Sequence, residues 1–423
     1  MSRVVLACWG SYGDLFPTLA IAARLQALGH TPVVASCPIY HDLVVAQGFE
    51  FRPLRPDVRP DDTELLHRVM DPKRGSEIVV KEIAAAAVRD SYEDLAAAAV
   101  GADLIVSHPI TFAAPLLAEK MQLPWLSTVL APLSFFSAYD FPVLPNAPQA
   151  VVLRSLGPWT GRLVMKMARQ ITASWCGPVR AFRAELGLPR GGDPLYEGQF
   201  SPHGTLALFS RLLGNAQRDW PAKTRLTGFP FFNSAIDMPD ELTAFLDAGE
   251  PPVVFTLGTS AVSAAGSFYE ESAKAIETLK CRAVLLIGRH PENRPRQLPS
   301  NVLAIDSAPH DQLFSRASAI VHQGGVGTTG QAMRSGTPQL VVPHAHDQPD
   351  NAFRVTNLGI ARTLFPKRYA AAQVVTALTS LRTDPRYRER ADVVGRQVRA
   401  ETGAASAAAA IVAALKYGNV DAH

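Results

Sequence analysis

The chain has little cysteine and no long apolar run. Its four cysteines, Cys8, Cys37, Cys176 and Cys281, are scattered over 423 residues without a Cys-x-x-Cys pair. We therefore expect reduced, mostly buried thiols and neither a disulfide framework nor a cysteine metal site. No uncharged apolar run reaches the roughly 18 residues of a membrane helix, and the first apolar run ends at Gly10, too early for a secretory signal. These absences favour a cytoplasmic protein.

Charge of one sign is also lacking. The formal net charge is +3, from 41 Lys and Arg against 38 Asp and Glu, and no basic block occurs along the chain. A nucleic-acid partner is therefore not expected. Apolar residues make up 47% and charged residues 19%, which is typical of a folded globular protein. A chain of this length exceeds a single core, so two domains of roughly 200 residues each are expected.

Short apolar runs alternate with helical segments in both halves of the chain. The first half predicts a strand at 4–8, a helix at 18–28 and a strand at 31–36, with later strands within 102–109 and 124–132. A second series begins with "PVVFTLGTS". Such alternation is typical of βαβ units and parallel sheets. The predicted fold class is α/β, with two Rossmann-like doubly wound domains that face each other across a cleft at the carboxyl ends of their strands.

The segments outside these two series are less regular. Residues 133–225 are rich in Pro and show no clear strand period, so they form either a binding surface or a variable structural insertion. The stretch "LTGFPFFNSAIDMPDEL" has the Gly, Pro and Asn content of a linker. We expect the last predicted helix to pack on one of the two domains, and packing back on the first domain is one of these two arrangements. The predicted divisions are a first domain, a linker, a second domain and this helix, at residues 1–228, 229–240, 241–395 and 396–423.

Two motifs in the second half indicate a phosphorylated, hydroxyl-rich ligand. "AIVHQGGVGTTGQAMRSG" predicts a buried strand, a glycine-rich turn and a helix. A helix N-terminus binds anions, and glycines let the backbone approach a phosphate closely, although a tight turn without a ligand is the alternative. "TPQLVVPHAHDQPDNAFRV" places Asp347 and Gln348 after the next strand. A carboxylate beside a carboxamide suits the hydroxyl groups of a sugar.

Together these motifs resemble the nucleotide-sugar signature of the UDP-glycosyltransferase superfamily, whose enzymes have the GT-B fold. The resemblance rests on "HQGGVGTT" and on the spacing from Pro343 to Asp347 and Asn351, and it extends to "VVFTLGTS" and "DSAPHDQLF". "GSYGDLFPTLAIAARLQALGH" and "DWPAKTRLTGFP" are most similar to bacterial enzymes of the rhamnolipid rhamnosyltransferase type and to sterol and flavonoid glycosyltransferases. The resemblance implies that the first domain binds the acceptor and the second domain binds the nucleotide sugar.

The same resemblance implies roles for residues of the second domain. Ala308 would present its backbone to the base, Gln331 would reach the ribose, and Asp347 with Gln348 would hold sugar hydroxyls, of glucose and rhamnose alike. The implied diphosphate site consists of Thr259, Ser260, His322, Gly327, Thr328 and Thr329. The expected nucleotide-sugar site also includes Gly13, Gly324 and Gly325. Ser307 replaces a base-stacking Trp of plant relatives, and Gln331 replaces their ribose-binding Glu. Because of these two departures, the resemblance does not distinguish a uridine nucleotide from a thymidine nucleotide in the donor.

The stretch "WGSYGDLFP" contains the candidate catalytic base. Asp14 matches, by resemblance, the Asp of the "GSxGD" loop that bacterial relatives use where plant relatives use His. A positioned carboxylate can take the proton of an acceptor hydroxyl late in an oxocarbenium-like displacement, and we expect burial to raise its pKa. A helix cap is the alternative role, and the two roles are compatible. Gly10 and Gly13 let the loop turn sharply and leave room for acceptor and sugar.

His108 and three aromatic residues are further candidates in the first domain. His108 ends another predicted strand at the same edge, where it either orients the acceptor or Asp14 or serves as a structural histidine. Phe135, Phe136 and Tyr139 in "LSFFSAYDFP" either line an apolar acceptor pocket or pack in the core.

The motif "HAHD" raises the question of a metal ion. His344 and His346 alternate along an extended segment, and this spacing directs both rings to one face, as in many metal sites. The family resembled needs no metal, because a helix N-terminus can stabilise the leaving nucleotide. We therefore expect no metal and no cofactor other than the nucleotide-sugar co-substrate.

The sequence thus predicts an inverting, metal-independent O-glycosyltransferase. Its donor would be a UDP- or TDP-sugar, and its acceptor would be a hydroxyl of an apolar small molecule such as a flavonoid or other phenol, a sterol or a hydroxy-fatty acid. An apolar acceptor is also compatible with transient contact at a membrane surface. Two alternatives remain at this point: a nucleotide-sugar epimerase of the same fold, and a non-catalytic nucleotide-sugar-binding protein.

Overall fold

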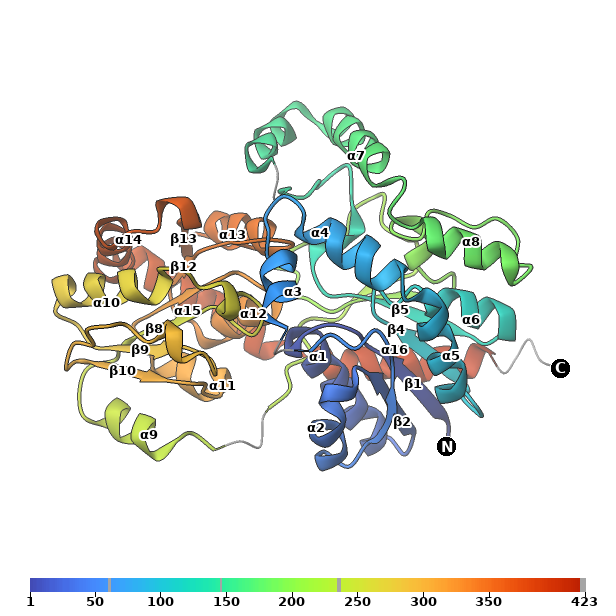
Figure 1. Ribbon diagram of the computed structural model, residues 1–423, viewed down its shortest axis with the longest axis horizontal. Coiled ribbons are helices and arrows are strands. Elements are labelled where there is room, and N and C mark those ends of the chain that lie inside the picture. Colours follow the sequence, from blue (N-terminus) through green and yellow to red (C-terminus); the bar gives the residue numbers. More distant parts are fainter. Residues whose placement is uncertain (60–61, 145–146, 234–236, 419–423) are drawn as a thin grey trace.

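The computed structural model contains two parallel sheets, one in each half of the chain. Figure 1 shows them in two lobes, the first coloured blue to green and the second mainly yellow to orange. The α/β class with two Rossmann-like lobes is therefore confirmed. Residues 234–236 of the predicted linker and 419–423 of the predicted final segment lie outside the described residues. The structure describes residues 1–59, 62–144, 147–233 and 237–418.

The first sheet has seven parallel strands in the order β3-β2-β1-β4-β5-β6-β7. The strands are β1 (Arg3–Ala7), β2 (Thr31–Ser36), β3 (Glu50–Pro53), β4 (Leu104–Ser107), β5 (Trp125–Val129), β6 (Thr205–Ala207) and β7 (Thr224–Leu226). Because helices cover a parallel sheet on both faces, central strands such as β4 are buried along their whole length. β2 and β4 lie on opposite sides of β1, so the switch point of the topology, where such sheets bind ligands, falls between β1 and β4.

The helices of the first lobe follow these strands in the alternation that the sequence predicted. They are α1 (Tyr12–Ala27), α2 (His41–Ala46), α3 (Thr63–Val69), α4 (Gly75–Glu77), α5 (Val88–Ala98), α6 (Ala113–Met121), α7 (Pro158–Thr172) and α8 (Gly177–Glu185). A π-helical segment, η2 (Ile78–Ala85), follows α4, and the 3-10 helical segments are η1 (Pro38–Tyr40), η3 (Pro132–Phe135), η4 (Pro148–Leu156) and η5 (Glu197–Gln199).

The second sheet has six parallel strands in the order β10-β9-β8-β11-β12-β13, with its switch point between β8 and β11. The strands are β8 (Val253–Thr256), β9 (Ala283–Leu286), β10 (Val302–Ile305), β11 (Ala319–His322), β12 (Gln339–Val341) and β13 (Ala361–Thr363). The helices are α9 (Asp240–Asp247), α10 (Phe268–Leu279), α11 (His310–Leu313), α12 (Val326–Ser335), α13 (Gln348–Asn357), α14 (Ala371–Thr383), α15 (Pro385–Ala400) and α16 (Gly403–Gly418). The helical turns are η6 (Ala261–Ala264), η7 (Pro291–Asn293), η8 (Phe314–Arg316) and η9 (Pro366–Arg368).

Two segments cross from one lobe to the other. α16 returns to the first lobe and packs on α1, where Ile411 and Leu415 join the core of the first sheet (Figure 1). In the opposite direction α3 contacts η6, and Met70 joins the core cluster around Phe255 of the second sheet. Each lobe therefore buries apolar side chains that the other lobe contributes.

The structure corrects two local predictions. The helix after β1 begins at Tyr12 rather than at residue 18, because Ser11 caps it, so Asp14 lies in the first turn and not in the preceding loop. Within 133–225 the sequence showed no strand, whereas β6 and β7 are present. Each has only three residues, too few to show an alternating period.

The four cysteines lie among the residues that the structure describes. All four cysteines are free, and Cys8, Cys37 and Cys176 are buried.

One helical stretch, Pro385–Lys416, is long and apolar enough to pass the length and composition test for a membrane span. It consists of α15, which packs on α12 and α14, and α16, which packs on α1. In this fold both helices therefore cover the lobes.

Candidate active site

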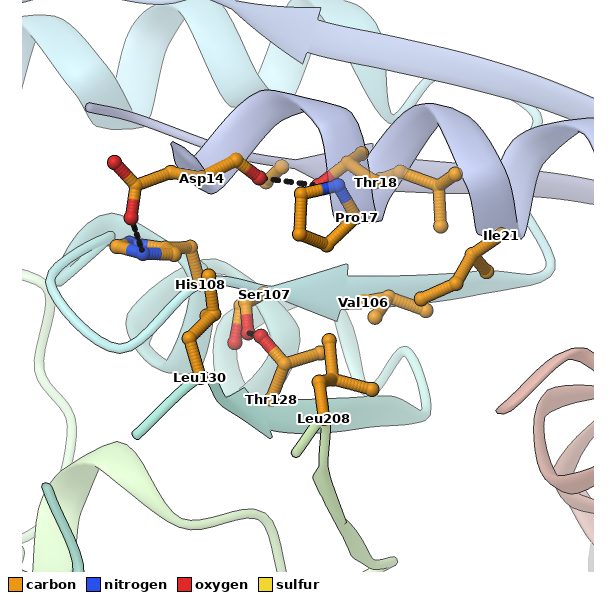
Figure 2. A pocket seen from close by; sticks show the side chains of 12 residues that line it. Asp14, Pro17, Thr18, Ile21, Val106, Ser107, His108, Thr128, Leu130 and Leu208 are labelled. Carbon is orange, nitrogen blue, oxygen red and sulfur yellow. Dashed lines mark hydrogen bonds and ion pairs between the residues drawn. The ribbon is translucent and has the colours of Figure 1, made fainter. Parts of the chain in front are cut away.

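Asp14 and His108 meet at the carboxyl edge of the first sheet, after β1 and β4 respectively. His108 Nε2 lies 3.1 Å from Asp14 Oδ1, and Figure 2 shows the two side chains pointing toward one another. Because an ionised carboxylate only accepts hydrogen bonds, Nε2 carries the proton. The structure thus brings together the two residues that the sequence named as catalytic candidates, and it makes His108 a partner of Asp14.

Asp14 also caps the helix in which it lies. The Ser11 backbone N–H and Oγ–H donate to Asp14 Oδ2 at 2.7 and 3.0 Å, and the Gly13 N–H donates to Ser11 Oγ at 3.2 Å. This reciprocal pattern is a capping box. The cap uses Oδ2 and leaves Oδ1 to His108, so capping and pairing with the imidazole coexist in one side chain.

Gly10 provides the space for this carboxylate. Its φ is +140°, and a Cβ at this position would lie 2.4 Å from Asp14 Oδ2. The Tyr40 hydroxyl donates to the Gly10 carbonyl at 2.9 Å and holds the loop. The sequence interpretation gave the space beside Gly10 to acceptor and sugar, whereas the structure gives it to Asp14 itself.

The pKa of Asp14 differs from the expectation. Burial raises this pKa, but the hydrogen bond and charge of His108 and the hydrogen bonds from Ser11 outweigh burial and hold the pKa below its ordinary value. The predicted increase is wrong because it counted burial and omitted these partners. Asp14 is therefore ionised at neutral pH and able to accept a proton.

The space directly beneath the Asp14–His108 pair is a cavity of about 10 Å³. This volume suffices for no more than about one water molecule. An acceptor molecule must therefore reach Asp14 from another side. The walls seen in Figure 2 include Pro17, Thr18, Ile21, Val106, Ser107, Thr128, Leu130 and Leu208.

His322 holds the glycine-rich turn at the end of β11. It is fully buried, its Nδ1 accepts the Gly324 N–H at 3.1 Å, and its Nε2 lies 3.0 Å from Gln339 Oε1. Burial lowers its pKa to about 4, so the ring is neutral. A Cβ on Gly324, whose φ is +89°, would lie 2.7 Å from Val341. His322 thus shapes the turn, and both of its ring nitrogens are engaged by the protein rather than free for a diphosphate.

The N-terminus of α12 faces the loop that carries Asp14. Gly325 is the N-cap, and Gly327 and Thr328 lie in the first turn, where backbone amides have no carbonyl partner within the helix. A Cβ on Gly327 would lie 3.5 Å from Gly13 Cα, so the two lobes touch where α1 and α12 begin. A helix end suited to anions therefore lies beside the residue that precedes Asp14.

Several polar side chains lie near this helix end, but Thr329 is not grouped with Thr328. Gln323 Nε2 lies 3.4 Å from Thr328 Oγ1, and Gln323 also packs against Gly258 after β8. The Oε1 atoms of Gln323 and Gln331 are buried without a partner among the described residues. Thr329, by contrast, is fully buried in the interior, so the structure does not place its hydroxyl with that of Thr328.

Three predicted residues lie on loops at the carboxyl edge of the second sheet. Thr259 and Ser260 follow β8, with Thr259 exposed and Ser260 partly exposed. Ala308 follows β10 and is also partly exposed. These positions leave the three residues open to a ligand.

Asp347 lies at the start of α13 and reaches α12. Its Oδ2 accepts the Val326 N–H at 3.1 Å and an Asn351 Nδ2–H at 2.7 Å. Burial raises the pKa of Asp347 to about 7 against the lowering effect of Asn351, and the negative charge of Asp14 raises it further. The charge of Asp14 thus acts on Asp347 from the other lobe, and the pKa values of the two carboxyl groups are shifted in opposite directions.

Gln348 has one of its two functional groups committed to the protein. Its Oε1 accepts the backbone N–H groups of His344 and Ala345 at 2.8 and 3.1 Å. The Nε2 amide is therefore the group that it can offer to a ligand.

The two histidines of the "HAHD" motif are largely neutral. Burial lowers the pKa of His344 to about 4 and lowers that of His346 as well. His346 has a φ of +57°, and its Nδ1 lies 3.3 Å from Ser76 Oγ of the first lobe. In the described part of the chain, no group of three His, Cys, Asp or Glu side chains is arranged to hold a metal ion.

The aromatic acceptor candidates lie apart from the candidate base. Phe135 and Phe136 line a cavity of about 630 Å³ next to α7, and Phe135 also stacks on Trp220 with ring centroids 3.8 Å apart. Tyr139 is exposed and is not part of the lining. Phe135 thus packs in the core and also borders this cavity. Asp14 is not among the residues that line this cavity.

Sequence reasoning missed a buried charge network between the lobes. Arg354 of α13 donates to Asp350 Oδ2 and Asp140 Oδ2, both at 2.7 Å, and Arg154 lies 3.0 Å from Asp140 Oδ1. Asp350 Oδ1 accepts the Val143 N–H at 3.0 Å. The only sequence signal was an Asp-x-x-x-Arg spacing on one helix face, which is common on solvated helices.

Two Rossmann-like lobes that contact each other at the carboxyl ends of their strands are the architecture of the GT-B glycosyltransferases. Residues 274–416 match the family model "Erythromycin biosynthesis protein CIII-like, C-terminal domain". The chain is 33% identical to O-mycaminosyltylonolide 6-deoxyallosyltransferase of Streptomyces fradiae, over 96% of each chain. A sterol 3-beta-glucosyltransferase of Neurospora crassa is 27% identical over 98% of this chain and 27% of its own length.

A solved structure shows the same fold. The glycosyltransferase VinC in complex with dTDP superposes with a TM-score of 0.68 at 20% identity, over 98% of this chain and all of that chain. The chain belongs to the UDP-glycosyltransferase superfamily, as the sequence motifs indicated. It is therefore a glycosyltransferase of the natural-product and sterol type, rather than an epimerase or a non-catalytic binding protein.

Proposed function

We propose that this chain is an inverting O-glycosyltransferase that moves a sugar from a UDP- or TDP-sugar to a hydroxyl of an apolar small molecule. The observation that carries the proposal is the contact between Gly13 and Gly327, which sets Asp14 beside the first turn of α12. A proton acceptor on one lobe and a site for a leaving diphosphate on the other are the two elements that a single displacement requires.

In the proposed reaction, Asp14 accepts the proton of the acceptor hydroxyl. The acceptor oxygen forms a bond to the anomeric carbon, while the bond from that carbon to the diphosphate oxygen breaks and its electron pair leaves with the nucleotide. The amides of Gly327 and Thr328 and the dipole of α12 receive the developing negative charge. His108 holds Oδ1 and keeps Asp14 ionised, so that the carboxylate is ready before the hydroxyl arrives.

The donor would lie along the carboxyl edge of the second sheet. Asp347 and the Gln348 amide would bind sugar hydroxyls, Gln331 Oε1 would bind the ribose, and the Ala308 backbone would bind the base. Gln331 Oε1 is buried without a partner among the described residues, which suits an incoming hydroxyl donor. The name of the Streptomyces fradiae relative and the nucleotide bound to VinC support TDP-deoxyhexoses as the first donors to test, and the sterol relative supports UDP-glucose.

The proposal includes no metal and no cofactor, because the end of α12 supplies the electrostatic stabilisation of the diphosphate. It also places the reaction in the cytoplasm, where nucleotide sugars are available.

The test is a donor panel against an acceptor panel. TDP-deoxyhexoses, TDP-glucose and UDP-glucose are each incubated with a macrolactone, a flavonoid, a sterol and a hydroxy-fatty acid, and the products are analysed by mass. NMR of the product then gives the anomeric configuration, which must be opposite to that of the donor. Retention of configuration, or turnover of a donor without any acceptor, contradicts the proposal.

A further inference from the structure

A stripe of exposed apolar side chains runs along η4 and α7. On α7 they recur every four residues, a spacing that keeps them on one side of the helix. A row of exposed apolar side chains on one side of a helix is typical of a surface that contacts something other than water. Its members are Val152, Leu156, Trp159, Leu163, Met167 and Ile171, with side chains between 51% and 70% exposed.

Basic residues follow one edge of this stripe. Arg162, Lys166 and Arg169 are exposed and lie on adjacent turns of α7. Arg169 pairs with Glu197, and the Arg162 guanidinium lies 5.9 Å from the centre of the Tyr139 ring. Between residues 141 and 184 the sequence has no Asp or Glu, while it has six basic residues, Arg154, Arg162, Lys166, Arg169, Arg180 and Arg183.

The opposite side of α7 is already committed to the protein. Gly161 and Met165 are buried, and a Cβ on Gly161 would lie 2.0 Å from the Ala138 carbonyl oxygen. Figure 1 shows α7 at the upper periphery of the molecule, away from both sheets. The helix is therefore held by one face and presents the apolar stripe outward.

An apolar face with a Trp, flanked by Lys and Arg, on a segment that contains no Asp or Glu of its own, has the composition of a helix that lies in a membrane interface. In a dimer formed through this segment, the second copy would bring no Asp or Glu of the same segment to the basic edge. Anionic lipid headgroups carry the charge that complements this edge. We propose that η4 and α7 dock on the surface of an anionic phospholipid bilayer, with the apolar stripe in the interfacial layer and Arg162 and Lys166 at the headgroups.

The test measures co-sedimentation of the full chain with vesicles, without donor or acceptor, so its outcome is independent of the proposed reaction. One vesicle set contains phosphatidylcholine and phosphatidylglycerol at a ratio of three to one, and the other contains phosphatidylcholine alone. The variant Leu163→Glu/Ile171→Glu is compared with Val100→Glu/Val393→Glu, which adds the same charge at exposed apolar positions elsewhere. Trp159→Ala is a second variant that adds no charge.

We expect the chain to prefer anionic vesicles by about tenfold or more at low salt, and this preference to fall with added salt. Leu163→Glu/Ile171→Glu should lose about tenfold or more of this binding and Trp159→Ala a smaller share, while the matched control binds as the original chain. Equal binding to the two vesicle sets overturns the proposal, as does an equal loss in the matched control. So does a dimer, detected by light scattering, that only the α7 double variant dissociates, because a second copy would then be the occupant.

Discussion

The Asp347→Asn variant isolates the titration of one carboxyl group. In the wild-type chain Oδ2 accepts both hydrogen bonds, from the Val326 N–H and the Asn351 amide. An Asn side chain can accept the same two bonds through its single carbonyl oxygen. The variant therefore keeps the contacts of Asp347 and removes only its charge.

The expected effect follows from the pKa of Asp347, which burial raises from 3.8 to about 7 in the folded chain. The folded state then holds a proton that the unfolded state has lost, so stability falls as pH rises from about 4 and levels off above about 7. The full change in the free energy of unfolding with pH is about 4 kcal/mol. Roughly half of this change remains once the partial exposure of Asp347 to solvent is counted. About 1 to 2 kcal/mol of this loss falls between pH 5 and pH 8.5.

Thermal unfolding between pH 5 and pH 8.5 measures this difference. Asp347→Asn should unfold about 1 to 2 °C above the wild-type chain at pH 8.5, and the two should converge toward pH 5. Asp42→Asn, which removes a carboxylate from a fully exposed position, serves as the control and should follow the wild-type chain. Parallel curves for Asp347→Asn and wild type across this range would refute the raised pKa.

Four further predictions concern the candidate site. Asp14→Asn should lower transfer by about 10²-fold or more while a calorimetric titration shows donor binding retained, and loss of binding instead would contradict the role of Asp14 as base. His108→Gln should raise the pKa of Asp14, because burial then meets less opposition, and should move the acidic limb of the rate profile to higher pH; an unmoved limb argues against the pairing. Gly10→Ala should impair transfer as strongly as a defect in Asp14 itself, because the added Cβ displaces its carboxylate, whereas Gly29→Ala, a positive-φ glycine with open space around it, should not. Dialysis against EDTA should leave the transfer rate unchanged, and recovery of a lost rate on adding Mg²⁺ would contradict a metal-independent reaction.

The two sheets could be predicted from the sequence because fully buried parallel strands appear as short apolar runs. The segments around β6 and β7 could not, since three residues carry no period. Asp14 was identifiable as a candidate base from its loop, and His108 as a candidate partner at the same sheet edge, but their hydrogen bond was not, because these residues are 94 positions apart. Their meeting depends on β4 lying next to β1, which only the strand order shows. The pKa of Asp14 depends on the same partner, so its direction also required the structure.

The contact between the lobes could not be predicted from the sequence either. Its main polar component, the buried charge network, carries a desolvation cost. Asp350 is fully buried and Arg354 is 8% exposed, and placing such charges in the interior requires desolvation that their attraction repays only with good geometry. Replacement of a buried ion pair by apolar side chains of similar volume is often neutral or stabilising, so net stability alone does not explain the network. Its bonds are instead specific in position: Arg354 joins Asp140 of the segment after β5 to Asp350, three residues beyond Asp347. A shift of either lobe would leave a charge unpaired in the interior, which costs more than the loss of an apolar contact. The network therefore fixes the register between the segment that borders the 630 Å³ cavity and the helix that begins beside the proposed sugar-binding carboxylate.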